Sequence, residues 1–225
     1  MYTVKQEYLL RLGEIDELLS FINNIEGYKV VSSGGPVSLS ISIKLKSSSV
    51  LMMYNAIEST ITNTLKRIHE IINKDEINYT DATREIRRLV VTYYHSKSLS
   101  KNNSHDASDC LEELSFNILD KNKLNIQFEE MIKYYSLYSG NIDAKLVREV
   151  LSKYGINIPD KSTELKTIKD YRNHLAHGER TFEECGREIS FQHLSALRNA
   201  TDTFINSMLD AVDTFCINKA YKEHP

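Results

Sequence analysis

The segment 170–178 holds the densest group of reactive side chains in the chain, with the sequence DYRNHLAHG. Cleavage of RNA through the ribose 2′-hydroxyl needs a group that moves a proton and a cation that stabilises charge on the phosphate. Histidine moves protons near neutral pH, which suits His177 to the first task. The guanidinium of Arg172 offers phosphate oxygens a fixed fork, and Asn173 can orient the ribose or phosphate by hydrogen bonds. These residue types predict phosphodiester cleavage in which arginine supplies the charge stabilisation.

The spacing within this segment fits one helix. Asn173 and His177 are four residues apart and share a face of the helix. Arg172 and His177 point about 140° apart around the helix axis, so the long arginine side chain must reach around the helix to meet the histidine. His174 points about 60° away from His177, as a neighbour of the site or as a surface residue. At a helix C-terminus the dipole favours a protonated His177 by about 0.3–1 kcal/mol. Taken alone, the spacing favours a plainer interpretation, a surface arginine and a capping histidine.

Glu58 lies within one turn of Tyr54 and Ile57 in a predicted helix, close to its apolar stripe. A carboxylate there needs a partner to offset its desolvation, and Arg172 is the natural partner. The alternative is a solvated glutamate at the edge of the stripe. Asn55, on the same helix, has two possible roles. It could point into a cleft beside the segment 170–178, or it could form hydrogen bonds at the helix surface.

Apolar residues at steps of three and four predict helices along most of the chain. The expected ranges are 3–26, 46–73, 81–95, 107–117, 126–137, 144–154, 163–177 and a long final helix after Ser190. Asp81 is the expected N-cap of the third helix, and Asn141 or Asp143 that of the helix at 144–154. Gly155 and Gly178 suit the ends of two helices.

The segment 37–45 differs, because its apolar residues alternate with serines and one lysine. A period of two is typical of a strand, to which residues 28–31 could pair. The polar segment 96–106 is expected to be an exposed loop. The prediction is therefore an all-α domain with one short β-hairpin near 28–43.

The composition narrows the class of protein. Hydrophobic residues make up 41% and charged residues 26%, as in ordinary folded proteins, and the 8 glycines and 3 prolines disfavour an all-β chain. The 3 cysteines are far apart and form no CxxC pair, which argues against a zinc ribbon and a disulfide framework. No apolar run approaches the roughly 20 residues that span a membrane, and the N-terminus lacks a signal-peptide core. A cytoplasmic location without membrane attachment is expected.

The net charge of −3 argues against a large basic footprint for nucleic acid but leaves room for a local basic cleft. Arg84, Arg87 and Arg88 could hold phosphates, although such a cluster is more often a solvated face, here partly balanced by Asp81 and Glu85. Several tyrosines could stack bases, and core packing is the commoner role. These are Tyr93, Tyr94, Tyr134, Tyr135 and Tyr138. The remaining histidines show no shared spacing for a metal.

Residues 172–178 resemble the RxxxxH motif of the HEPN superfamily, including the asparagine after the arginine and the Ala-His-Gly ending. Three further stretches are similar to the MAE-type stand-alone branch of that superfamily. They are LMMYNAIEST at 51–60, GNIDA at 140–144 and FEECGR at 182–187. Their order and separation also fit, so the resemblance extends from about Leu45 to Phe215.

The resemblance implies an all-α, up-and-down helical bundle of the HEPN type. It forms a single domain over 1–225, with an N-terminal helix at 3–26, a Ser/Gly-rich connector at 27–44 and core helices at 45–217. The resemblance further implies a homodimer in which two motifs share one cleft, with an acidic residue, here Glu58, near the motif Arg172. The implied activity is RNA cleavage without metal or other cofactor by a toxin or antiviral-defence effector, whose partners are RNA and an antitoxin or defence-system protein. Glu179 stands where some HEPN toxins carry a modified tyrosine, so that form of antitoxin control is not expected. The alternatives are an inactive HEPN module that binds RNA or a partner protein, and a purely structural dimer.

Overall fold

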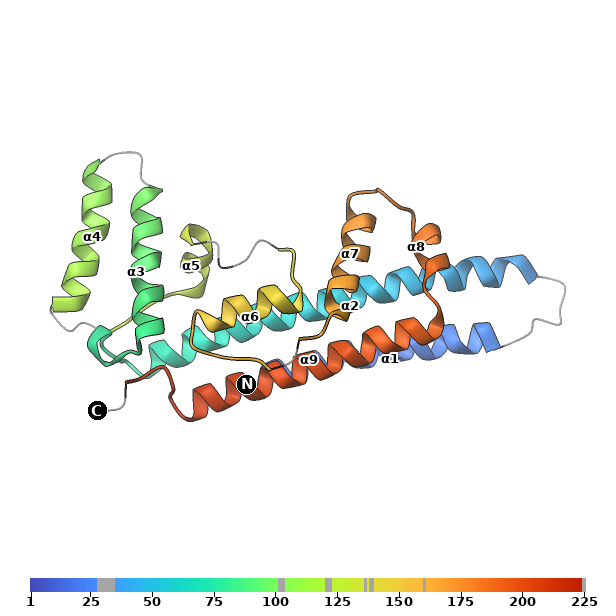
Figure 1. Cartoon of the computed structure of the whole chain (residues 1–225), viewed down its shortest axis with the longest axis horizontal. Coiled ribbons are helices and arrows are strands. Elements are labelled where there is room, and N and C mark those ends of the chain that lie inside the picture. The colour runs from blue at the N-terminus through green and yellow to red at the C-terminus, as the bar shows by residue number, and fades with distance from the viewer. Residues whose placement is uncertain are drawn as a thin grey trace.

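Three long helices lie side by side along the long axis of the molecule. The computed structural model describes residues 1–27, 35–100, 104–119, 123–135, 137, 140–159 and 161–223. In Figure 1, α1 (Tyr2–Gly27) and α9 (Phe191–Ile217) lie along one side of the long helix α2 (Gly35–Lys74). Of the shorter helices, α3 to α5 and α7 to α8 project on its other side, and α6 overlaps α2 in this view, between the α3–α5 group and the α7–α8 pair (Figure 1). The predicted all-α class is confirmed.

The long helices are held by apolar side chains at helical spacing. In α1 the buried residues follow steps of three and four, as the sequence predicts. They are Val4, Tyr8, Leu12, Ile15, Leu19 and Ile22. Each large apolar side chain that is fully buried stabilises the fold by about 1.5–3 kcal/mol relative to exposure. Burial of these stripes is therefore the main force that aligns α1 and α9 with α2.

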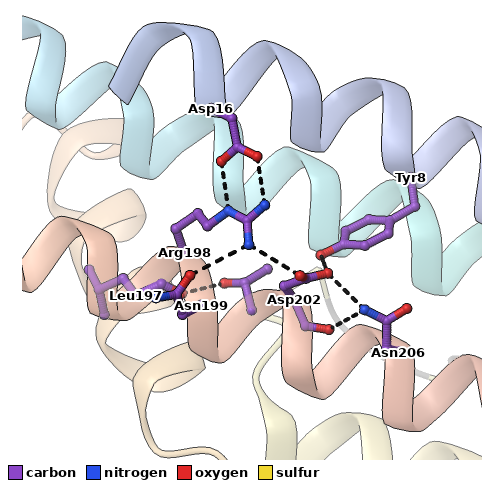
Figure 2. Close-up of polar contacts among 8 residues, drawn as sticks. Tyr8, Asp16, Leu197, Arg198, Asn199, Asp202 and Asn206 are labelled. Carbon is purple, nitrogen blue, oxygen red and sulfur yellow. Dashed lines mark hydrogen bonds and ion pairs between the residues drawn. The ribbon is translucent and has the colours of Figure 1, made fainter. Parts of the chain in front are cut away.

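A polar network fixes α1 against α9 beside this core (Figure 2). Arg198 of α9 donates two hydrogen bonds to the carboxylate of Asp16 on α1, at 2.7 and 2.6 Å. It also donates to Asp202 at 3.1 Å, and Asp202 accepts a further hydrogen bond from the hydroxyl of Tyr8 at 3.2 Å. Asn206 completes the network through its amide, which donates to Asp202. A forked guanidinium bound on two sides sets the register of the two helices.

The third helix begins later than predicted. Helix α3 spans Arg84–Leu99, whereas Asp81 belongs to the 3₁₀ turn η1 (Tyr79–Asp81) and does not cap α3. The reason is the C-terminal segment, which hydrogen-bonds to this turn: the Glu223 N–H donates to Asp81 and the Thr83 N–H donates to Tyr221. The side chain of Asp75 binds the hydroxyl of Tyr221 at 2.7 Å, together with two lysines. These contacts keep the chain extended until Thr83.

Helices α3 to α6 are otherwise close to their predicted positions. They are α3, α4 (Ser104–Leu119), α5 (Phe128–Tyr134) and α6 (Ala144–Ser152). The loop predicted at 96–106 is shorter than expected, because α3 continues to Leu99 and α4 begins at Ser104. The Asp143 side chain caps α6 by accepting from the Leu146 N–H at 2.9 Å, and Gly155 adopts a φ of +84° after the helix.

The predicted β-hairpin near 28–43 is wrong where the structure describes it. Residues from Gly35 onward belong to α2, and residues 28–34 lie outside the described residues. The only β-bridges in the described part are isolated, between Asn78 and Lys123 and between Ala82 and Lys222. The expected connector at 27–44 is correspondingly shorter. Tertiary packing overrides the alternating pattern, because the face of α2 that is buried here includes Ser42 and Ser47 with Ile43.

That face of α2 packs closely against α8 (Phe182–Glu188). Ser47 donates a hydrogen bond to the Phe182 carbonyl at 2.7 Å, and the buried Lys46 ammonium donates to the Ile189 carbonyl at 3.1 Å. At Gly186 a Cβ atom would lie 1.8 Å from the backbone oxygen of Ile43. The two helices therefore touch backbone to backbone, a distance that only glycine permits.

None of the helices in the described residues combines the length and apolar character that crossing a membrane requires.

We expect Gly186→Ala to lower the free energy of unfolding by about 2 kcal/mol or more, because the methyl group forces α8 away from α2. The measurement is thermal or urea unfolding followed by circular dichroism. Gly13→Ala is the matched control: this position of α1 has nothing within 4 Å, so the change should be neutral or stabilise by up to about 1 kcal/mol. Equal stability of the two variants would contradict the close α2–α8 contact.

Candidate functional site

The motif lies at the end of α7 (Glu164–Ala176), which is one residue shorter at each end than predicted. His177 occupies the C-cap position, and its backbone N–H donates to the Asn173 carbonyl at 3.0 Å. Gly178 follows with a φ of +68°, a left-handed conformation that ends the helix. Sequence and local structure therefore agree that His177 stands at the negative end of a helix dipole.

Arg172 is held against an aromatic ring. Its guanidinium carbon lies 4.5 Å from the ring centroid of Tyr54, which belongs to α2. Tyr54 is fully buried, at 0% exposure, whereas Arg172 is half-buried. A cation at this distance from a ring is attracted to its face by about 0.5–2 kcal/mol, depending on how far it is desolvated. The ring therefore limits where the guanidinium can lie.

Tyr54 also ties α2 to the segment that precedes α6. Its hydroxyl donates to the Gly140 carbonyl and accepts a hydrogen bond from the Ile142 N–H at 3.2 Å. Burial raises the pKa of Tyr54, the hydrogen bond from Ile142 lowers it, and the nearby Glu58 carboxylate raises it again. The net shift is upward, so the ring that faces Arg172 is a neutral phenol at neutral pH.

Arg172 contacts Asn173 directly but forms no ion pair with Glu58. The guanidinium donates to the side-chain oxygen of Asn173 at 3.0 Å, so these two motif residues are in direct contact. Glu58 is half-buried, and in the described part of the chain it forms no ion pair with Arg172. The predicted ion pair between Glu58 and Arg172 is therefore not formed. Both charged side chains instead lie near the hydroxyl of Tyr54, on which their charges act.

The remaining predicted residues lie at the surface. His177 is exposed, and its ring makes no hydrogen bond to any described residue. The Nδ1 atom of His174 lies 2.7 Å from the Glu179 carboxylate, so this histidine is occupied within the turn that follows α7. Asn55 is exposed on α2. Of the two motif histidines, His177 is the one free to meet a ligand.

Two ion pairs position α7. Lys169 binds Asp143, the residue that caps α6, through its ammonium. Although burial alone would raise the pKa of Asp143, Lys169 and the Leu146 N–H hold that pKa below its usual range. After the motif, Arg180 forms a forked pair with Glu188 at 2.6 and 2.8 Å, joining the turn to α8. Both ends of the motif are therefore fixed to neighbouring helices.

The sequence alone identified Tyr54 only as a member of an apolar stripe, and it did not identify the Lys169–Asp143 pair. The signal that could have found Tyr54 is its place one turn before Glu58, in a stretch that resembles the family. Within the described residues, no three histidine, cysteine, aspartate or glutamate side chains are close enough to hold a metal ion.

The fold is all-α, and a motif of arginine, asparagine and histidine ends one of its helices. A family model described as HEPN_MAE_28990/-like HEPN matches residues 4–221. The chain therefore belongs to this HEPN family, and the resemblance noted in the sequence is confirmed. No curated protein and no solved structure matches the chain.

We expect the ring of Tyr54, and not its hydroxyl, to position Arg172. Tyr54→Leu removes the ring and should abolish the ring-current shift of the Arg172 Nε–H proton in an NMR spectrum, whereas Tyr54→Phe should preserve it. Tyr54→Phe leaves the Gly140 carbonyl and the buried Ile142 N–H without their partner, and should cost about 1–3 kcal/mol of stability. An Arg172 signal that is the same in all three proteins would contradict the contact.

Proposed function

We propose that the chain is a metal-independent endoribonuclease that cleaves RNA by attack of the ribose 2′-hydroxyl. The observation that carries the proposal is the pairing of a held cation with a free proton carrier at one helix end. Arg172 stacks on the buried Tyr54, and His177 is exposed, with no hydrogen bond from its ring to any residue that the structure describes. A preorganised cation stabilises developing charge without having to reorganise.

The reaction follows from these groups. The 2′-oxygen attacks the adjacent phosphorus, the bond from phosphorus to the 5′-oxygen breaks, and the products carry a 2′,3′-cyclic phosphate and a 5′-hydroxyl. Arg172 stabilises the equatorial phosphate oxygens, since its fork matches their geometry. His177 moves the proton, and Asn173, in contact with Arg172, orients the ribose or phosphate. Glu58 acts on this arrangement through Tyr54.

Membership of the HEPN family supports the RNA substrate and, by the resemblance, a role as a toxin or antiviral-defence effector in the cytoplasm. An antitoxin or another defence-system protein is the corresponding partner. The same membership is compatible with a module that binds RNA without cleaving it, and the test below separates the two functions.

We expect purified protein to cleave single-stranded RNA in the presence of EDTA, to spare DNA, and to fail on RNA with 2′-O-methyl at the cleaved position. His177→Ala or Arg172→Ala should each lower the cleavage rate by about 10²-fold or more, because one loses the proton carrier and the other the charge stabilisation. The measurement is gel analysis of labelled RNA with mapping of the product ends.

His193→Ala and Arg11→Ala are matched controls, because each removes an exposed residue of the same type from another helix. Both should retain full activity. Cleavage of DNA, or strict dependence on magnesium, would refute the mechanism. Binding of RNA without cleavage by the intact protein would favour the inactive module.

We also expect a homodimer in which Arg172 and His177 of both chains line one cleft. Each chain has one motif, and the free His177 ring is available to a second copy or to substrate. Multi-angle light scattering at micromolar concentration should give twice the chain mass of 25.9 kDa. A monomer under these conditions would count against the shared cleft.

A further inference from the structure

A polar groove lies away from the motif, between α3, α6 and the end of α5. Its volume is about 690 Å³. The residues that line it come from α3, from α6 and from the positions just after α5 and α6. They include three cations, two carboxylates, two hydroxyls and a tyrosine. They are Arg84, Glu85, Arg88, Leu89, Thr92, Tyr135, Glu149, Ser152 and Lys153. The cations exceed the carboxylates by one, so this lining is locally basic in a chain whose net charge is −3.

Two of the three cations of this groove are available to a ligand. Arg84 and Arg88 are exposed and one turn apart on α3, and among the described residues neither forms an ion pair. Arg87, by contrast, is bound to Glu223 on another face of the helix. The three arginines that the sequence grouped together thus separate into one structural residue and two free ones. Two free guanidinium groups on adjacent turns present parallel forks to phosphate oxygens.

An aromatic ring lies in the same groove. The Lys153 ammonium sits 4.9 Å from the ring centroid of Tyr135, and it donates to the Leu137 carbonyl at 3.4 Å. Both residues line the groove with the two arginines. Cations that can track a backbone, next to a ring that can contact a base, are the chemistry of a site for single-stranded nucleic acid.

Helix α6 connects this groove to the motif. Its N-terminal end, at Asp143, contacts Lys169 of α7, and the residues before it bind Tyr54. Its C-terminal end, at Ser152 and Lys153, lines the groove. Nine residues of helix span about 13 Å. Figure 1 shows α6 between α3 and α7 along the long axis of the molecule. A strand that leaves the motif along α6 therefore reaches the groove within a few nucleotides.

We propose that the groove between α3 and α6 binds a nucleotide of the same RNA strand whose scissile phosphate lies at Arg172 and His177. Arg84 and Arg88 bind its phosphates, and Tyr135 contacts its base. The inference rests on the proposed function for the identity of the strand. The groove thereby makes the protein bind longer RNA strands more tightly than shorter ones.

The test measures binding, in His177→Ala protein, of fluorescein-labelled single-stranded RNAs of 4 and 12 nucleotides by fluorescence anisotropy. Adding Arg84→Ala and Arg88→Ala should weaken binding of the 12-mer by about 10-fold at low salt and leave the 4-mer unchanged. The slope of log affinity against log salt for the 12-mer should fall by about 1.4, at about 0.7 for each lost phosphate contact. Glu149→Gln should tighten binding of the 12-mer, since it removes a carboxylate from the same groove.

The matched control is Lys5→Ala with Arg11→Ala, which removes the same charge from α1, on the other side of α2, and should leave both affinities unchanged. An unchanged 12-mer affinity in the arginine variant, or equal weakening of both lengths, would overturn the proposal. Binding of adenosine monophosphate that is lost in the arginine variant, without a length effect, would assign a free nucleotide to the groove and overturn the shared strand. Because the readout is binding, groove-dependent affinity in a wild-type protein that does not cleave would refute the nuclease activity alone.

Discussion

The contacts of Tyr54 are the constraint on which the rest of the site depends. This buried residue of α2 connects three parts of the chain. Its ring contacts the guanidinium of Arg172 on α7, and its hydroxyl hydrogen-bonds to the segment before α6. A phenol buried this completely needs its hydrogen bonds satisfied, because an unpaired polar group in the core is costly. The requirement that stabilises the fold therefore also fixes the position of the motif arginine.

The motif combines rigid and open parts. On one side, Lys169 binds the cap of α6, and on the other, Arg180 binds Glu188 of α8. Between these anchors, His177 is exposed at the helix end. A side chain that moves protons must reach a substrate, whereas a cation that stabilises charge works best when it is already in place. The two motif residues differ in burial in the way that these different tasks require.

Much of the fold could be predicted because the apolar steps in α1, α2 and α9 record which faces are buried, and because Asp143 and Gly178 mark helix ends through local chemistry. The strand predicted at 37–45 failed for a reason that periodicity cannot reveal. Serine counts as a solvent-facing residue in an alternating pattern, but Ser42 and Ser47 are buried because small side chains let α8 approach. In the same way, Arg172, Asn173 and His177 could be chosen by residue type and spacing. The contact of Arg172 with Tyr54 joins positions 118 residues apart, and no local pattern encodes it.

The glycine at the crossing of α2 and α8 bears on how related sequences diverge. At position 186 there is no room for even one additional carbon atom beside the Ile43 carbonyl, so a relative with a larger residue there must have its two helices farther apart. Since α8 is joined to the turn after the motif by the Arg180–Glu188 pair, that separation would also move the loop beside His177. The residue at this position can thus serve as a marker in sequence alignments, separating relatives that keep this geometry of the motif from those that have changed it.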